Sequence, residues 1–153
     1  MGMQVIDIEE RSAAEPAAVY ALLRDGAAWP TFSGLGSFEL ERPSDDGLPG
    51  EGLGAIRIFR TPQKIGPTIE NHELIVEAEP DRRFAYELLS GLPLKGYRAT
   101  TTLTPDGSGT RIHWRSTFTA KVPGTGWIYR RQLRRFIGEL VEGLARAAER
   151  VHT

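Results

Sequence analysis

The stretch WIYRRQLRRFIGELVEGLARAAERV, residues 127–151, decides the fold of this chain. At 100° per residue, its apolar side chains fall within an arc of roughly 140°, which is the pattern of an amphipathic helix. Gly143 lies at the edge of this arc, where the missing side chain leaves room for another element. No other segment offers a helix of this length, so we expect the rest of the chain to pack against it. The arc consists of Leu133, Phe136, Ile137, Leu140, Val141, Leu144, Ala147, Ala148 and Val151.

Short strands separated by turn residues precede this helix. Residues 4–10 form an opening strand, and Glu15-Pro16 begins a short helix that ends near Asp25-Gly26. Trp29 follows, and its aromatic ring is expected to cap one end of the core. Glycine, proline and aspartate then divide the middle of the chain into segments with β-character, and short connections between them predict antiparallel neighbours. The candidate strands are Ser37–Arg42, Leu53–Thr61, Thr68–Ala78, Arg83–Leu89, Tyr97–Thr104 and Thr110–Lys121.

These elements predict an α+β fold, in which a curved antiparallel sheet of seven strands wraps the C-terminal helix. The length of 153 residues suits a single domain over residues 1–153. A formal charge of −1 gives no electrostatic reason to expect nucleic acid, and the absence of cysteine excludes disulfides and thiolate chemistry. No signal peptide or apolar run of about 18–20 residues is apparent, so we expect a cytoplasmic protein.

Motifs that often mark an active site are weak in this sequence. The glycine-rich residues 50–54 lack the GxGxxG spacing and lead into a strand, so they predict a plain turn. The three histidines, His72, His113 and His152, are scattered without metal-ligand spacing, so we expect no metal and no cofactor.

Arginines gather at the start of the long helix. A solvated helix face is the main interpretation of this cluster, and a contact with an anionic headgroup or a partner is the alternative. The cluster consists of Arg130, Arg131, Arg134 and Arg135.

Polar residues embedded in predicted strands are more informative. Arg57 lies between Ile56 and Ile58, and a charge that faces a core must be paired or hydrogen-bonded. Glu73 is a possible partner, but its direction is open from alternation alone. Counting apolar residues turns Leu74 and its alternates inward, which would place Glu73 in water.

The order of elements and several short motifs resemble the SRPBCC, or START-like, helix-grip superfamily. The resemblance is strongest to its polyketide cyclase/dehydrase and lipid-transport branch, and it covers nearly the whole chain. The motifs are Trp29-Pro30 after the short helix, Gly54-Ala55-Ile56-Arg57, Glu73 ahead of Glu79-Pro80, Tyr86, Tyr97, Gly109-Thr110-x-Ile112-x-Trp114 and the helix 126–151.

The resemblance implies a cavity between the sheet and the helix, closed by loops at residues 62–67 and 90–96. It turns Glu73 inward, against the apolar count. It implies acid–base or orienting roles for Glu73, Tyr97 and Arg57. The other implied ligand-binding residues are Trp29, Phe59, Thr61, Asn71, Tyr86, Leu88, Ala99, Trp114, Ser116, Phe118, Gln132, Phe136 and Leu140.

Two departures from the superfamily weaken the case for catalysis. The cyclase arginine expected late in the strand before Glu79-Pro80 is absent from residues 76–78, and no lysine matches the one that pairs with a ligand carboxylate. The first hypothesis is therefore a protein that binds or carries a hydrophobic, aromatic or lipid-like small molecule. The alternative is a cyclase or dehydratase that uses Glu73. As partners we expect this ligand, no nucleic acid, at most transient membrane contact, and a monomer or homodimer.

Overall fold

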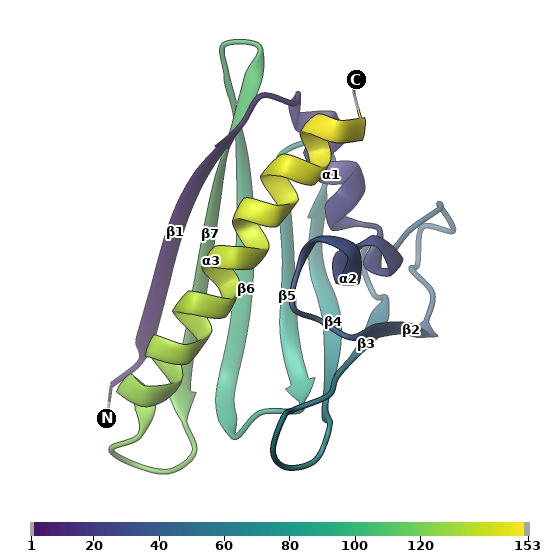
Figure 1. The fold of residues 1–153 in the computed structure, drawn as a ribbon. Coiled ribbons are helices and arrows are strands. Elements are labelled where there is room, and N and C mark those ends of the chain that lie inside the picture. The colour runs from purple at the N-terminus through teal and green to yellow at the C-terminus, as the bar shows by residue number, and fades with distance from the viewer. Residues whose placement is uncertain (1, 152–153) are drawn as a thin grey trace.

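An antiparallel sheet and one long helix dominate the computed structural model, which describes residues 2–151 (Figure 1). The seven strands of these residues lie in the order β1-β7-β6-β5-β4-β3-β2. The predicted α+β fold, a curved sheet around a C-terminal helix, is confirmed. The strands are β1 (Gln4–Ser12), β2 (Ser37–Arg42), β3 (Ile56–Thr61), β4 (Ile69–Glu79), β5 (Arg83–Ser90), β6 (Leu94–Asp106) and β7 (Gly109–Ala120). The helices are α1 (Pro16–Leu23), the 3-10 turn η1 (Gly26–Ala28), α2 (Trp29–Phe32) and α3 (Gly126–Val151).

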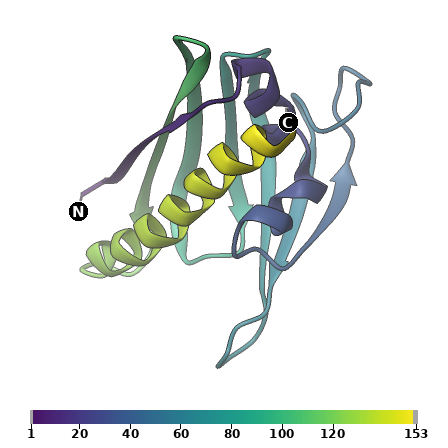
Figure 2. The same cartoon turned by 45° about the horizontal axis from the view of Figure 1, so that its top comes forward.

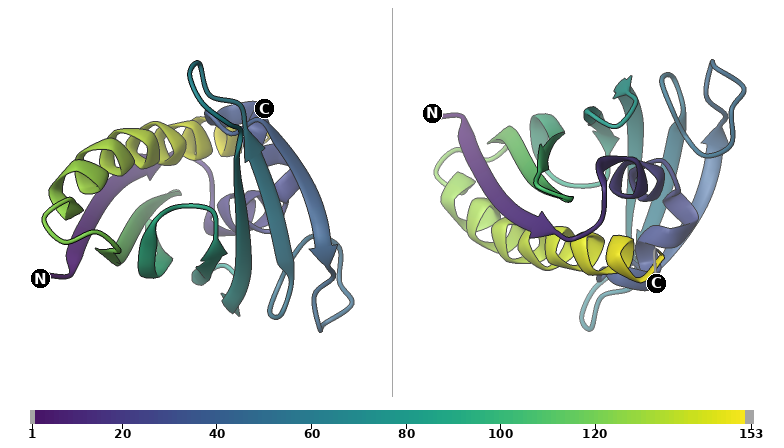
Figure 3. Two further views of the ribbon diagram at one scale, coloured as in Figure 1. Left: turned by 90° about the horizontal axis from the view of Figure 1, so that it is seen from below. Right: turned by 90° about the horizontal axis from the view of Figure 1, so that it is seen from above.

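Helix α3 crosses the concave face of the sheet diagonally, from the β1 edge to the pair α1 and α2 (Figure 2). Seen end on, the sheet curves around the helix (Figure 3). The apolar arc of the sequence is the face that the helix buries, since Ile137, Leu140, Val141, Leu144, Ala147 and Ala148 are all buried. No helix within residues 2–151 combines the length and the apolar character that a membrane span requires. His152 and the side chain of Val151 lie outside the described part.

Gly143 gives α2 the room that the sequence indicated. A Cβ atom at this position would overlap the backbone carbonyl oxygen of Phe32, the last residue of α2. The missing side chain therefore lets α2 lie directly on α3. This contact holds Trp29, at the start of α2, over the inner part of the core.

Two strand boundaries differ clearly from the prediction, and glycine explains both. Strand β3 begins at Ile56 rather than Leu53, because Gly54 has a φ of +85° and a tight turn ends where the Ala55 amide donates to the Gly52 carbonyl. Strand β6 begins at Leu94 rather than Tyr97, because its pairing with β7 continues across a bulge at Gly96, whose φ is +63°. The loop predicted over residues 90–96 therefore shrinks to 91–93.

Candidate ligand-binding site

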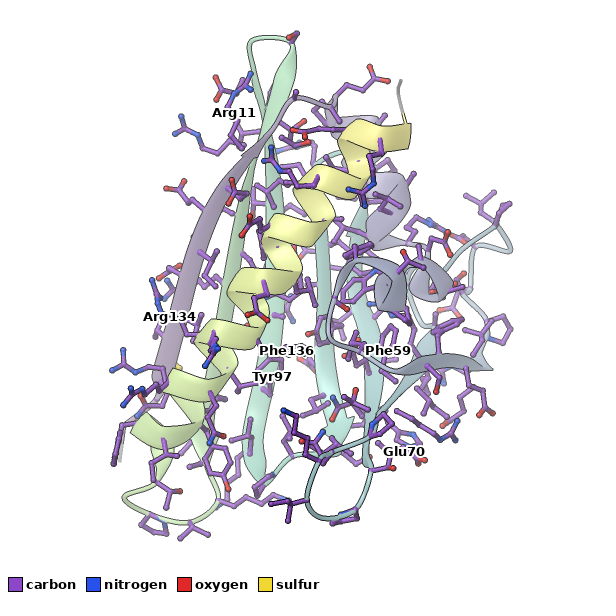
Figure 4. The ribbon with its side chains drawn as sticks, viewed as in Figure 1. Arg11, Phe59, Glu70, Tyr97, Arg134 and Phe136 are labelled. Atoms are coloured by element: carbon purple, nitrogen blue, oxygen red, sulfur yellow. The ribbon has the colours of Figure 1, made fainter. Side chains whose placement is uncertain are left out.

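A small cavity lies between the concave face of the sheet and α3. Its volume is about 40 Å³, which is room for roughly two or three water molecules. Figure 4 shows Tyr97 of β6 and Phe136 of α3 in this space between sheet and helix. The lining residues are Trp29, Leu35, Asn71, Glu73, Tyr86, Leu88, Leu92, Tyr97, Trp114, Leu133, Phe136, Ile137 and Leu140.

A wider mouth adjoins this inner cavity. Its volume is about 630 Å³, within the range typical of sites for small organic ligands. The loop between β3 and β4, the loop between β5 and β6, and the first half of α3 form its wall. The mouth and the inner cavity share the wall residues Leu35, Asn71, Leu92, Leu133 and Phe136, so the two volumes adjoin.

Arg57 and Glu73 meet inside the sheet, at directly paired positions of β3 and β4. The Arg57 side chain is fully buried, and one Nη donates to Glu73 Oε1 at 3.4 Å. The other Nη donates to the Leu23 carbonyl at 2.9 Å. The guanidinium also stacks on the Trp29 ring, with its Cζ 4.3 Å from the ring centroid.

A second carboxylate completes this charge cluster. Glu51 is buried in the glycine-rich loop, with its Oε1 3.7 Å from an Arg57 Nη. The same oxygen accepts a 2.7 Å hydrogen bond from the backbone amide of Gly26. A Cβ at Gly26 would crowd both Glu51 and Phe38, so the glycine lets this loop close over the buried arginine. We define Arg57, Glu51 and Glu73 as the buried charge cluster.

The buried charge cluster holds two carboxyl groups against one guanidinium. Burial raises the pKa of Glu73 to about 7, and the Arg57 guanidinium only partly opposes this rise. Burial also raises the pKa of Glu51, again against the pull of Arg57. Glu73 is the member of the cluster that lines the cavity. Its carboxyl group is therefore poised between its two protonation states near neutral pH.

Two tyrosines stand beside Glu73 and remain protonated. Burial raises the pKa of Tyr97 to about 12, and burial followed by the nearby Tyr97 raises the pKa of Tyr86 well above its usual value. The Tyr97 hydroxyl lies 2.9 Å from Ser116 Oγ, which also accepts a 2.9 Å hydrogen bond from Trp114 Nε1. This chain of bonds fixes the Tyr97 side chain at the cavity wall.

Two polar atoms near the junction of the mouth and the inner cavity lack a partner among the described residues. Asn71 Oδ1 and Thr61 Oγ1 are both buried without a hydrogen bond. Asn71 lines the inner cavity and the mouth, whereas Thr61 lines the mouth alone. A buried polar atom without a partner is costly, so these atoms favour a bound molecule or water that can reach them.

A comparison with models of known protein families assigns the chain to a family. A family model described as "Polyketide cyclase / dehydrase and lipid transport" matches residues 3–149. The chain belongs to this family. A search of curated protein sequences gives no match.

Solved structures agree with membership in the polyketide cyclase/dehydrase and lipid-transport family at the level of the fold. A START superfamily protein from Mycobacterium smegmatis superposes with a TM-score of 0.81 at 14% identity, covering 98% of this chain and 99% of the other. TTHA0849 from Thermus thermophilus gives 0.77 at 20% identity, with 98% and 100% covered. The KanY protein gives 0.75 at 18% identity, with 97% and 99% covered. The helix-grip fold is therefore confirmed.

Most residues that the resemblance assigned to the ligand site line the inner cavity. They are Trp29, Asn71, Glu73, Tyr86, Leu88, Tyr97, Trp114, Phe136 and Leu140. Thr61 and Gln132 line the mouth instead. Phe136 takes part in both walls.

Five predicted residues lie behind the wall, not in it. Phe59 stacks on Trp29, with ring centroids 5.5 Å apart, and Phe118 stacks on Tyr97 at 6.0 Å. Arg57 lies behind Glu73 and Trp29, Ser116 is buried and bonded to Tyr97 and Trp114, and Ala99 is 1% exposed. The resemblance placed these side chains on the inner face, but bulky aromatic neighbours in front of them close off the cavity.

Sequence reasoning missed part of the site. Glu51 was absent from the predicted set because a glycine-rich turn gives no sign of a buried carboxylate. Leu35 and Leu92 belong to short loops, where no periodicity indicates an inward side chain. Leu133 and Ile137 follow from the helix arc, since the face of α3 that packs on the sheet also borders the cavity.

Proposed function

We propose that the protein binds a hydrophobic small molecule, aromatic, polycyclic or lipid-like, in the mouth, with its polar end toward Glu73 and Tyr97. The observation that carries this proposal is that the two volumes adjoin and share five wall residues. A mouth of about 630 Å³ leads onto an inner cavity of about 40 Å³ that ends at a carboxyl group and two tyrosine hydroxyls. An apolar passage with few polar groups at one end is the usual form of a small-molecule site. The description of the matched family, which includes lipid transport, supports the same function.

The polar groups favour a neutral ligand with hydrogen-bond donors over a carboxylate. The inner wall has no cation among the described residues, because the Arg57 guanidinium lies behind Glu73. Asn71 Oδ1 is an unused acceptor, and Glu73 accepts hydrogen bonds when it is ionised. A fatty-acid headgroup would bring a second anion toward Glu73, whereas a phenol, alcohol or amine would meet acceptors.

A fluorescence titration tests the binding. N-phenyl-1-naphthylamine is a neutral apolar probe with an N–H donor, and we expect it to bind saturably at one site per chain. Leu133→Trp fills the passage that the mouth and the inner cavity share, and should weaken binding at least tenfold. Leu89→Trp is the matched control, because Leu89 is 53% exposed and lines neither volume. Absence of saturable binding, or equal weakening in both variants, would contradict the proposal.

Catalysis is the second candidate, and the Glu73 carboxyl favours it. A buried carboxyl with a pKa of about 7 that faces a cavity can accept and return a proton at neutral pH. In this scheme, Tyr97 donates a hydrogen bond to a developing oxyanion and Arg57 positions Glu73 without touching the ligand. A cyclase or dehydratase of this kind would convert the bound molecule itself.

Glu73→Gln separates the two candidates once a ligand has been found by the titration. An enzyme predicts that mass spectrometry detects a product with the wild-type protein and none with Glu73→Gln, although both bind the ligand. Product formed at an unchanged rate by Glu73→Gln would remove this residue from the mechanism. Ligand recovered intact from the wild-type protein would favour the carrier.

A further inference from the structure

Exposed apolar side chains gather at the end of the molecule where the mouth opens. Ile65, in the β3–β4 loop, is 91% exposed, and Val122 and Trp127, around the start of α3, are 56% and 58% exposed. Both segments lie at the lower end in Figure 1, far from the β6–β7 hairpin at the upper end. The mouth is lined by residues 61–64 of the first segment and by the α3 turns that follow the second. The apolar tips therefore flank the entrance to the cavity.

The same end is positively charged, although the whole protein is not. Residues 61–69, 88–97 and 117–138 contain seven lysines and arginines and no aspartate or glutamate. The formal charge of the chain is −1, so the remaining residues together carry −8. Within the described part, Lys64, Lys121, Arg130 and Arg131 form no ion pair, whereas most other exposed arginines do. These cations are free to meet an external anion.

We propose that this end, with Ile65, Val122 and Trp127 at its tips, docks on the surface of an anionic lipid bilayer. Cations near such a surface attract it electrostatically, and apolar side chains, tryptophan above all, settle at the boundary between headgroups and acyl chains. An acidic protein or a nucleic acid would satisfy the cations but would leave three separated apolar tips in water. In the docked orientation the mouth faces the lipid, so a hydrophobic molecule passes between bilayer and cavity without crossing bulk water. The surface goes beyond the ligand site and does not depend on it.

Trp127 reports this docking by itself. The other two tryptophans, Trp29 and Trp114, are each 1% exposed, so quenching by lipid must come from Trp127. Vesicles of phosphatidylcholine with about one third phosphatidylserine, carrying bromine on the acyl chains, should quench the fluorescence of the full chain. Vesicles of brominated phosphatidylcholine alone should quench little, and added salt should reverse the quenching with the anionic vesicles.

Charge variants with a matched control test the orientation. Lys64→Gln with Lys121→Gln should weaken partition into the anionic vesicles at least tenfold, since each cation contributes about fivefold. The control is Arg82→Gln with Arg111→Gln, which removes two exposed cations at the opposite end and should change partition less than twofold. Ile65→Ser tests the apolar contact and should weaken partition severalfold at unchanged charge.

Several results would overturn the docking surface. They are no partition into anionic vesicles, equal loss in the two charge variants, and partition that leaves Trp127 unquenched. Binding to heparin as tight as to vesicles would assign the cations to a soluble polyanion and would also overturn it. Ile65→Ser should leave the binding of N-phenyl-1-naphthylamine unchanged, because Ile65 lines neither the mouth nor the inner cavity. Failure of the ligand site and failure of the docking surface are therefore distinguishable.

Discussion

The closed end of the cavity and its mouth are built on opposite physical rules. At the closed end, three charged side chains, Arg57, Glu51 and Glu73, are at most 8% exposed and are held by aromatic rings, a backbone carbonyl and a backbone amide. At the mouth, short loops carry an isoleucine that is 91% exposed and cations that form no ion pair with any described residue. Buried charges tolerate little change because every lost partner leaves another charge unpaired, whereas exposed loop residues change at little cost. Stability is thus concentrated at the closed end, whereas the mouth is the part to which we assign the proposed contacts with ligand and lipid.

Removing Arg57 should give the largest effect. Arg57→Met leaves two buried carboxyl groups without their cation, which should lower the free energy of unfolding by about 3–5 kcal/mol at pH 8. The deficit should shrink at pH 5, because both carboxyls can then take up protons. Denaturant unfolding at the two pH values measures it.

Arg60→Met is the control on the same strand. Its side chain is 39% exposed and pairs with Glu39 and Glu70 at the surface, so the expected loss is much smaller than in Arg57→Met. An equal loss in the two variants would mean that the buried charge cluster does not dominate the closed end.

Glu73 should give the next largest effect, visible as a pH dependence. Its pKa in the folded protein is about 7, above the usual value of 4.5, so the folded state binds more protons between these pH values. The contribution of Glu73 to stability must then fall as pH rises from 4.5 to 7. Glu73→Gln removes this contribution, so the stability of the variant relative to wild type should rise across that window, by about 3 kcal/mol at most.

Glu70→Gln is the opposite case. His72 and Arg60 lower the pKa of the exposed Glu70, so this carboxylate stabilises the fold at pH values above its ordinary pKa. The relative stability of Glu70→Gln should therefore fall slightly as pH rises toward 4.5, below the window in which Glu73 titrates. A parallel pH dependence in the two variants would contradict the burial of charge at Glu73.

The sequence allowed the buried faces of the closed end to be predicted, but not which of the buried side chains border the cavity. The 3.6-residue period of α3 is a local signal, and it predicted the face that the helix buries. The flanking of Arg57 by Ile56 and Ile58 left its direction open, and the family resemblance turned it inward. Glu73 was ambiguous because β4 departs from strict alternation, with a register shift between Ile75 and Glu77. An apolar count assumes regular alternation, which a bulge interrupts.

Contacts between loops and the core escaped prediction altogether. Glu51 is buried because its loop folds onto Gly26, 25 residues earlier in the chain, and no local pattern records that contact. Phe59 and Phe118 were placed on the correct face, but alternation does not say whether a side chain borders the cavity or lies behind Trp29 and Tyr97. Whether a buried side chain borders the cavity depends on the volumes of its neighbours, and only the folded structure brings these neighbours together.

Two glycines of α3 provide a smaller and sharper test. Gly143→Ala adds a Cβ that overlaps the Phe32 carbonyl oxygen, so α2 must shift, and we expect a loss of about 1–3 kcal/mol despite the better helix propensity. Gly138→Ala is the matched change, because its Cβ would find its nearest atom, Ile8 Cδ1, at 3.8 Å. This variant should gain up to about 1 kcal/mol in thermal or denaturant unfolding. A gain in both variants would mean that α2 is not seated on α3.

The mouth should show the smallest effect on stability. Ile65→Ser replaces a side chain that is 91% exposed, so the free energy of unfolding should change by less than about 0.5 kcal/mol. The same variant is expected to weaken partition into anionic vesicles. At the mouth, a substitution can therefore change binding without changing the free energy of unfolding. At the closed end, a substitution of Glu73 must change both, because Glu73 faces the cavity and also belongs to the buried charge cluster. A loss of more than about 1 kcal/mol in Ile65→Ser would show that this loop packs against the fold in solution and would remove the contrast between the two ends.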